Sequence, residues 1–291
     1  MKAFILRLLK SALGVFWRLH RPLTSANVRF KNRHAGETCL IFANGGSLKY
    51  YDVSKFPKLP AIACTYSLID NRMRSVDLKY VASTDSYLFY PLLYNTYPFV
   101  RRFQKNMVRK IFRKIMADNP QVQFFVNLTN YYSPLCRAGN VNYFHHFGDK
   151  TSGSCDLAGK FAVCQGALDV MLGMAKYLGF SKAVLVGCDY LGSPPMMGHF
   201  YADSRTFTGA YLSEYCERVK AVADRLGIEV LAILPKGVSC PVFEYSSYED
   251  YFGIQAKYTE NTEFIDVQYL EWLRDAASVN QAIMNADQEA A

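Results

Sequence analysis

The feature that most constrains this fold is a continuous apolar run that closes on small and polar residues. Residues 183–186 read Ala-Val-Leu-Val, and Gly187, Cys188, Asp189 and Tyr190 follow directly. Such a run is typical of a strand buried on both faces of a parallel sheet. Polar residues at the carboxyl end of such a strand lie where open α/β sheets bind ligands. We therefore expect a site after this strand, although a core strand with an ordinary polar loop would give the same pattern.

The loop after this strand adds further chemical groups. It contains two prolines and a glycine, and it carries Gly198-His199-Phe200-Tyr201. One short stretch therefore offers the carboxylate of Asp189, the imidazole of His199 and the phenols of Tyr190 and Tyr201. A neutral imidazole with a pKa near 6.5 suits proton transfer at neutral pH. The alternative is that His199 is an ordinary surface histidine.

Other apolar runs repeat this pattern and predict further strands. They cover residues 38–43, 60–64, 78–83, 121–128 and 228–234. Helical patterns at 97–116, 156–178 and 207–226 separate several of these runs. Alternating strands and helices indicate the α/β class, with a doubly wound, mostly parallel, Rossmann-like sheet. Two loop segments, at about 129–157 and 190–207, are long enough to act as lids over a site.

A glycine-containing loop follows the first predicted strand. It reads Asn44-Gly45-Gly46-Ser47-Leu48. Glycines here permit close approach of the backbone to a ligand, and free N–H groups at a helix start attract phosphate. The loop is neither GxGxxG nor a Walker loop, which argues against a standard dinucleotide or ATP site. An ordinary turn has the same composition. Thr65 and Asp85 follow the next two strands and extend the candidate site.

Positive charge is concentrated at the amino end of the chain. The net charge is +8, yet residues 1–36 hold eight Lys and Arg and no acidic residue. Residues 1–21 place a basic arc opposite Leu, Phe and Trp side chains, which suits the plane of an anionic membrane surface. Arg7 and Lys10 interrupt the apolar stretch too early for a bilayer-spanning helix. The alternative is a helix that docks on its own domain or on a partner.

These patterns divide the chain into three parts. We expect a membrane-associating arm over 1–35, a Rossmann-like catalytic domain over 36–258 and a C-terminal helical segment over 259–291. The basic helix at 97–116 presents a solvated face, a second membrane contact or a surface for an anionic acceptor. Nucleic acid is not an expected partner, because no recognised binding motif accompanies the charge. The expected location is peripheral, at an anionic membrane surface.

Four features together resemble the bacterial sialyltransferases of glycosyltransferase family 42. They are Asn44–Leu48 after a strand, Thr151-Ser152-Gly153, a helix that ends in Tyr177–Phe180, and a strand that closes on Gly187–Tyr190. The resemblance covers roughly residues 37–245, and Pro235 after the last strand fits it as well. It implies a GT-A-like variant of the Rossmann fold. The pterin diphosphokinase family is similar to much of the same pattern and is the competing interpretation.

The resemblance also implies roles for individual residues. Asn44 would contact the nucleotide, and either Ser152-Gly153 or Gln165-Gly166 would contact the nucleotide or its carboxylate. Tyr190 and Tyr201 would hold the leaving phosphate, and His199 would be the base. Thr65 stands where the family often has Asn. The full set of expected donor-binding residues is Asn44, Gly45, Gly46, Ser47, Thr65, Asp85, Ser152, Gly153, Gln165 and Asp189.

The resemblance, together with these patterns, implies an enzyme, an inverting and metal-independent glycosyltransferase without a cofactor, located peripherally on the cytoplasmic face of the inner membrane. It would move sialic acid or a Kdo-like acidic sugar from a CMP-sugar to a glycan or glycolipid acceptor in lipopolysaccharide, lipooligosaccharide or capsule synthesis. A homo-oligomer is compatible with this prediction. Two alternatives stay open. A diphosphokinase would use ATP with magnesium on Asp85 and Asp189, whereas a non-catalytic membrane scaffold would need neither His199 nor Asn44.

Overall fold

The computed structural model describes residues 14–83, 110–132, 138–146, 153–163, 166–202, 206–207, 212–257 and 263–275. Three expected site residues, Asp85, Ser152 and Gln165, lie outside the described residues. The same holds for residues 1–13 of the expected arm and for residues 97–109 of the expected basic helix.

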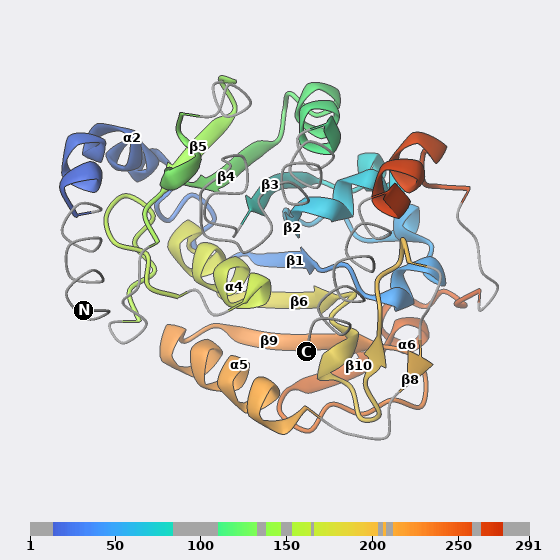
Figure 1. Ribbon diagram of the computed structural model, residues 1–291. Helices are drawn as coiled ribbons and strands as arrows, with labels where there is room; N and C mark the ends of the chain where they lie inside the picture. The colour runs from blue at the N-terminus through green and yellow to red at the C-terminus, as the bar shows by residue number, and fades with distance from the viewer. Residues whose placement is uncertain are drawn as a thin grey trace, which may run out of the picture.

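An eight-stranded sheet with all neighbouring strands parallel forms the centre of the molecule (Figure 1). The strand order is β10-β9-β6-β1-β2-β3-β4-β5, so β1 is central and β6 returns to its far side. This is the α/β, Rossmann-like architecture that the sequence predicts. The strands are β1 Thr38–Phe42, β2 Ala61–Cys64, β3 Leu78–Ser83, β4 Gln123–Asn127, β5 Val141–Phe144, β6 Lys182–Val186, β9 Glu229–Leu234 and β10 Glu244–Ser247.

The central strands are apolar throughout because both faces of the sheet are covered. Side chains alternate between two cores, so that Cys39 and Ile41 pack on one face whereas Leu40 and Phe42 pack on the other. The first face is covered by α4 (Ala167–Leu178) and α5 (Ser213–Leu226), which lie in front of the sheet in Figure 1.

Both long helices stop at a glycine in the left-handed region. Gly179 ends α4 with φ of 97°, and Gly227 ends α5 with φ of 59°. Gly179 is therefore the C-cap of α4, directly after residue 178, where the helical pattern was expected to end. A side chain at Gly179 would also lie 2.9 Å from the Cα of Asn32, so this position has no room for one.

Among the residues that the structure describes, those covering the second face form mainly short elements. The connections from β1 to β2 and from β2 to β3 contain 3₁₀ turns instead of α-helices. Helical residues 110–118 and 267–275 complete this layer. The short elements are η2 Gly46–Lys49, η3 Val53–Lys55, η4 Thr65–Ile69, η5 Asn71–Ser75, η6 Leu128–Asn130, η8 Asp189–Leu191 and α6 Tyr248–Phe252, with a hairpin of β7 Met196–Met197 and β8 Thr206–Phe207.

The amino-terminal segment packs on the edge of the sheet at β5. Residues 14–19 are helical, and α2 (Arg21–Ser25) and η1 (Ala26–Phe30) follow. Asn27 donates hydrogen bonds to the carbonyls of Tyr143 and Leu157 at 2.6 and 2.8 Å. Phe30 is buried in the core on the α4 side. Within the described residues, no helix is long and apolar enough to cross a bilayer.

The structure also contains strands that the sequence pattern does not predict. β5 lies inside the segment 129–157, which we expected to be a loop, and β10 follows Pro235. Both are four-residue strands at the two edges of the sheet. β10 reads Glu-Tyr-Ser-Ser, and its partly exposed edge position requires no apolar run. The helix expected over 156–178 begins only at Ala167.

Candidate functional site

The chain changes direction across the sheet between β1 and β6. From β1 it proceeds through β2 to β5 on one side, and β6 then pairs with β1 on the other side. The loops after β1 and β6 therefore lie next to each other at the carboxyl edge of the sheet, where open α/β folds bind their ligands. Asn44–Ser47 follows β1, and Gly187–Tyr190 follows β6. The topology thus brings together the two motifs that the sequence singled out.

Asp189 and Ser47 connect these two loops. The Asp189 carboxylate accepts a hydrogen bond from the Ser47 backbone N–H at 2.7 Å and another from Ser47 Oγ at 2.5 Å. Asp189 is 1% exposed. Burial raises its pKa to about 6, and the two hydrogen bonds from Ser47 act in the opposite direction. Both oxygens of this carboxylate are therefore engaged inside the protein.

Gly45 and Gly187 allow the two loops to approach closely. The N–H of Gly45 donates to the carbonyl of Gly187 at 2.8 Å. A Cβ on Gly45 would lie 2.4 Å from both that carbonyl and Asp189 Oδ2. Gly187 has φ of 69°, in the left-handed region that favours glycine. The glycines therefore serve packing between loops, and the N–H groups of Gly45 and Ser47 are not free to bind phosphate as we expected.

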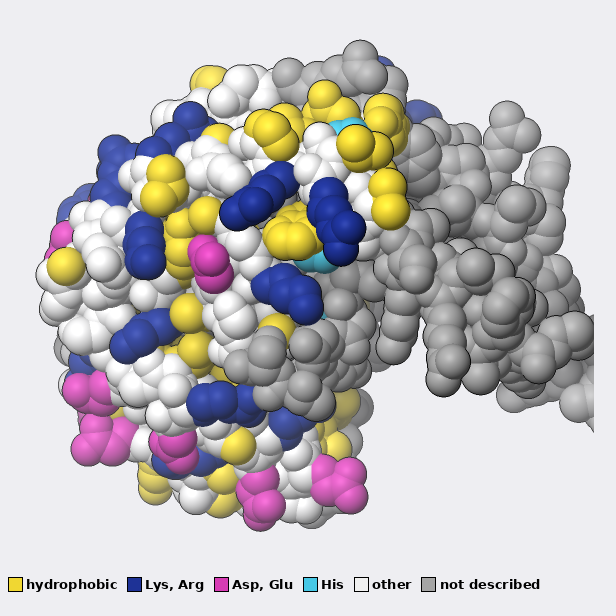
Figure 2. All heavy atoms as spheres, turned by 90° about the vertical axis from the view of Figure 1, so that its left-hand side faces the viewer, with side chains coloured by type: hydrophobic (Ala, Val, Ile, Leu, Met, Phe, Trp, Pro, Cys, Tyr) yellow, Lys and Arg dark blue, Asp and Glu magenta, His cyan; other side chains and the backbone are white. Residues whose placement is uncertain are grey.

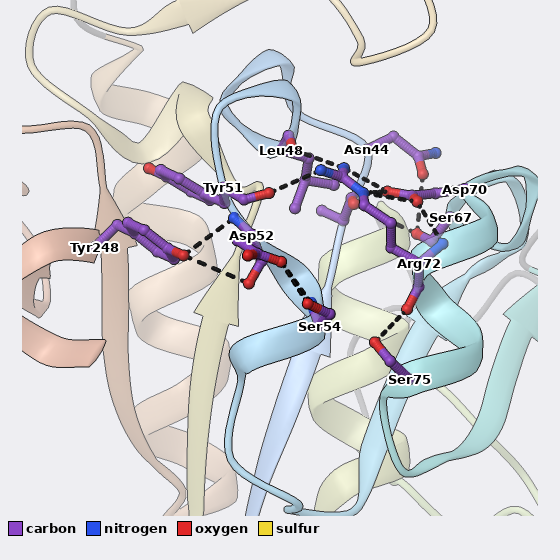
Figure 3. Close-up of polar contacts among 11 residues, drawn as sticks. Asn44, Leu48, Tyr51, Asp52, Ser54, Ser67, Asp70, Arg72, Ser75 and Tyr248 are labelled. Atoms are coloured by element: carbon purple, nitrogen blue, oxygen red, sulfur yellow. Dashed lines mark hydrogen bonds and ion pairs between the residues drawn. The ribbon is translucent and has the colours of Figure 1, made fainter. Parts of the chain in front are cut away.

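Asn44 is the first polar residue of the loop after β1, and its side chain is bonded to the segment after β2. Ser67 Oγ, in η4 after β2, donates to Asn44 Oδ1 at 3.0 Å (Figure 3). This bond orients the Asn44 amide with its oxygen toward Ser67 and its NH₂ group, which can donate two hydrogen bonds, away from Ser67. Asn44 is partly exposed, whereas Ser67 is buried. Asn44 is thus a positioned hydrogen-bond donor at the switch point.

Arg72 holds the surrounding loops together. Its guanidinium donates to the carbonyls of Leu48 and Tyr51 at 2.9 and 2.8 Å and pairs with Asp70 at 2.7 Å (Figure 3). The ring of Phe264 lies 3.6 Å from the guanidinium carbon. The planar fork of an arginine can bind several acceptors at once. Arg72 therefore ties the segment after β1 to the segment after β2.

His199 lies beside the Asn44 loop. A β-bridge joins Gly45 to His199, and the N–H of Phe200 donates to the Asn44 carbonyl at 3.0 Å. The His199 ring stacks on Tyr201 with centroids 5.1 Å apart, and its residue stays exposed. Partial desolvation of the imidazole lowers the pKa of His199 below its ordinary value of 6.5, and a hydrogen bond with the Asn44 backbone acts in the opposite direction. His199 is therefore mainly neutral at pH 7.

Tyrosines frame this imidazole on the second face of the sheet. Tyr201 lies 5.8 Å from the ring of Tyr66, which follows Thr65 in η4. Burial raises the pKa of Tyr201, so its hydroxyl stays protonated and can donate a hydrogen bond. Thr65 itself is buried and donates to the carbonyl of Ala82 at 3.3 Å. The Thr65 hydroxyl is therefore bonded to the end of β3.

Tyr190 lies in a different environment. It packs against the core on the α4 and α5 side, whereas Tyr201 packs against the opposite core. Its hydroxyl accepts a hydrogen bond from Tyr215 at 3.0 Å, and burial raises the pKa of both phenols, that of Tyr215 to about 12. The structure therefore does not pair Tyr190 with Tyr201 around one phosphate.

A polar cluster lies around Tyr190 at the start of α4. Asp169, in the first turn of α4, is fully buried, and its Oδ2 lies 3.6 Å from Arg218 Nη2. The Arg218 guanidinium also stacks over Tyr215 at 4.3 Å. Tyr215 and Arg218 lie one turn apart in α5. Sequence reasoning missed this cluster, because the three side chains come from two helices that the pattern treats as ordinary core helices.

The structure places only the glycine of each candidate nucleotide-contacting pair, because Ser152 and Gln165 lie outside the described residues. Gly166 precedes α4 at the carboxyl edge of the sheet, and a Cβ there would lie 3.5 Å from the Tyr215 hydroxyl. Gly153 has φ of 61° and lies beside Arg225 at the end of α5, near the amino edge. Gly166 is therefore near Tyr190 and the switch point, and Gly153 is not.

Metal ligands do not gather in the part of the chain that the structure describes. No group of three His, Cys, Asp or Glu side chains there could hold an ion. Asp189, a magnesium ligand in the diphosphokinase alternative, has both oxygens bound by Ser47. The other expected ligand, Asp85, lies outside the described residues.

Comparison with known proteins gives structural neighbours only. No family model and no curated protein matches the chain. The sialyltransferase CstII from Campylobacter jejuni, in complex with the substrate analogue CMP-3FNeuAc, matches with 12% identity and a TM-score of 0.43, over 79% of this chain and 94% of that one. The monofunctional alpha-2,3-sialyltransferase Cst-I from Campylobacter jejuni matches with 13% identity and a TM-score of 0.40, over 85% and 96%.

Proposed function

We propose that this protein is a glycosyltransferase that moves an acidic sugar from a CMP-sugar to a hydroxyl of a glycan or lipid-linked acceptor. The reaction would serve the synthesis of a surface polysaccharide or lipooligosaccharide. The observation that carries this proposal is the position of a neutral imidazole, His199, against the Asn44 loop at the switch point of the sheet. The resemblance of the surrounding motifs to family 42 supports the choice of donor.

The reaction needs a base for the acceptor and a way to stabilise the departing phosphate. In the proposed step, the bond between the anomeric carbon and the CMP phosphate oxygen breaks, and the electron pair leaves with the phosphate. The acceptor oxygen attacks from the opposite face, which inverts the anomeric centre, and its proton passes to His199. A base with a lowered pKa is unprotonated at neutral pH and is ready for this step.

Two donors near His199 suit the charge that develops on the phosphate. The Asn44 amide is held by Ser67, and Tyr201, with its raised pKa, keeps a proton on its hydroxyl. Donors that are oriented before the reaction stabilise developing charge without reorganisation. In this proposal, Tyr190 holds the buried cluster at α4 in place, because its hydroxyl accepts the hydrogen bond from Tyr215.

The diphosphokinase alternative has less support. It requires carboxylates free to bind magnesium, and magnesium prefers an octahedral set of oxygen ligands. Asp189 is 1% exposed, and both of its oxygens accept hydrogen bonds from Ser47. Metal binding at Asp189 would require both bonds to break.

Ligand-dependent thermal unfolding tests this proposal. CMP, CDP, ATP and a pterin are each compared with and without magnesium. We expect CMP to stabilise the protein in EDTA, by about 2.7 kcal/mol at a hundredfold excess over its Kd. Asn44→Ala should weaken CMP binding about tenfold, whereas the matched control Asn71→Ala, at an exposed position, should not.

Turnover with CMP-sialic acid or CMP-Kdo then tests the chemistry. Release of CMP with a glycan acceptor should persist in EDTA. If only ATP with magnesium and the pterin stabilise the protein, the result supports the diphosphokinase alternative. A non-catalytic scaffold would show no stabilisation by any of the ligands. Its Asn44→Ala and His199→Ala variants would also unfold at the same temperature as the wild type, with no CMP release in any of the three proteins.

A further inference from the structure

Exposed apolar and basic side chains gather on the amino-terminal side of the molecule. Figure 2 shows yellow and dark-blue side chains interspersed on this face, with magenta acidic side chains mainly at its lower end. Val15, Leu19 and Val28 are 53%, 73% and 64% exposed. The exposed basic residues of the same segment are Arg18, Arg21, Arg29, Lys31 and Arg33. We call these eight residues the amino-terminal face.

The helix that carries part of this face is already docked by its other side. At about 100° per residue, Phe16, Trp17 and His20 share one arc, and Val15, Arg18 and Leu19 share the opposite one. Phe16 and Trp17 pack against the core, whereas Val15, Arg18 and Leu19 are exposed. The largest apolar side chains of this helix thus bind its own domain, and a second, outward stripe of apolar and basic residues remains.

Specific contacts fix the orientation of this face. Trp17 stacks on His145, directly after β5, with centroids 5.2 Å apart. His20 Nε2 lies 3.0 Å from the Tyr132 hydroxyl, shortly after β4. Arg29 donates to Asn142 Oδ1 at 2.6 Å. The docked helix therefore lies at the carboxyl ends of β4 and β5, on the same edge of the sheet as Asn44 and His199.

We propose that the amino-terminal face binds the surface of an anionic lipid bilayer. Charge complementarity supports this occupant, because residues 1–36 contain eight basic residues and no acidic one. Val15, Leu19 and Val28 would enter the boundary between headgroups and acyl chains, and the arginines would remain at the phosphates. The first thirteen residues, rich in Leu, Ile, Phe, Lys and Arg, extend the same composition.

This arrangement has a consequence for the substrate. A bilayer at the β4 and β5 end of the carboxyl edge would lie on the same edge of the sheet as the loops after β1 and β6. An acceptor carried on a lipid could then reach these loops without leaving the bilayer. Membrane binding itself does not depend on the proposed reaction, so the two proposals fail separately.

Vesicle sedimentation with the full chain tests the amino-terminal face. Vesicles of phosphatidylcholine alone are compared with vesicles that also contain phosphatidylglycerol. We expect binding to the anionic vesicles only, with a loss at high salt. Arg18→Gln/Arg21→Gln and Leu19→Ser should each weaken this binding at least tenfold. The matched controls are Lys236→Gln/Lys257→Gln, at exposed positions near α6, and Val267→Ser, at a residue that is 67% exposed.

Both control variants should bind anionic vesicles like the wild type. Unchanged thermal unfolding in every variant shows that the fold is intact, as expected for exposed positions. The proposal is overturned if the wild-type protein does not distinguish the two vesicles. It is also overturned if the Arg18/Arg21 and Leu19 variants bind like the wild type, since binding would then reside in residues 1–13 or elsewhere.

Discussion

The carboxylate of Asp189 accepts hydrogen bonds from both the backbone N–H and the hydroxyl of Ser47, which lies 142 residues earlier in the chain. This pair joins the loops after β1 and β6 at the point where the chain changes direction. A similar pair exists on the surface, where Asp52 accepts from the N–H and hydroxyl of Ser54 at 3.3 and 2.5 Å. The two pairs differ in burial and in the number of residues between the partners.

Asp189→Ala should destabilise the protein by about 2–4 kcal/mol, because two buried donors of Ser47 lose their acceptor. Asp52→Ala is the matched control and should cost at most about 1 kcal/mol, since water replaces its acceptor at an exposed site. Urea unfolding followed by circular dichroism measures both. Equal losses in the two variants would show that the Asp189 bond has no special role in joining the loops.

The ionisation of Asp189 should appear in the pH dependence of stability. Its pKa is raised from 3.8 to about 6 in the folded protein. The unfolded carboxyl therefore ionises first as the pH rises, and stability from this group falls between about pH 4 and pH 6 and is constant above. Because one pKa unit corresponds to about 1.4 kcal/mol, the loss is about 3 kcal/mol. From pH 4 to pH 7, the unfolding free energy of the wild type should therefore fall relative to that of Asp189→Asn, which has no ionisable group at this position.

Gly45→Ala should separate the two loops. The backbone at Gly45, with φ of −62° and ψ of 154°, accommodates any residue, so only the contact is at issue. The new Cβ would lie 2.4 Å from Asp189 Oδ2 and from the Gly187 carbonyl. We expect a loss of about 1–3 kcal/mol in unfolding free energy, together with weaker CMP binding. Gly139→Ala, where nothing lies within 4 Å of the added carbon, is the control; comparable losses at both positions would contradict the steric argument.

His199→Ala should lower turnover by roughly a hundredfold to ten-thousandfold if the imidazole is the base. CMP affinity should change little, because the base contacts the acceptor. The wild-type rate should rise with pH and level off, with its half-maximal point below pH 6.5, since the pKa of His199 is lowered. His34→Gln, before β1 at the opposite edge of the sheet, should retain both the rate and the profile. A His199→Ala enzyme with near-normal turnover would exclude this role.

The strands were readable from the sequence because burial on both faces leaves an uninterrupted apolar run. β3 was predicted at its observed bounds, 78–83, and β1, β2, β4, β6 and β9 within two residues. β5 and β10 were missed because strands of four residues at the sheet edges carry no such run. The position of the site followed from the polar residues after β1 and β6, since parallel strands bring those ends to one edge.

The roles of the individual site residues were harder to predict from the sequence than the strands. The sequence gives no indication that Asp189 faces Ser47, because their contact depends on the register between β1 and β6. Gly45, in the loop after β1, was expected to help bind phosphate, yet it is needed for the close approach of this loop to the loop after β6. Ser67 and Arg72, which position Asn44 and its loop, occur in a segment without a motif. Contacts between distant segments of this kind follow from the fold and not from local pattern.

The central place of β1 has a consequence for how the chain is made. One edge of β1 pairs with β2, which ends at Cys64, whereas the other edge pairs with β6, which begins only at Lys182. At roughly 5–20 residues per second, a ribosome needs on the order of ten seconds to reach that strand. During this interval an apolar strand edge is open to pairing with another nascent chain. Fragments that end before Lys182 should therefore aggregate, and efficient production should depend on chaperones that bind the first half of the protein.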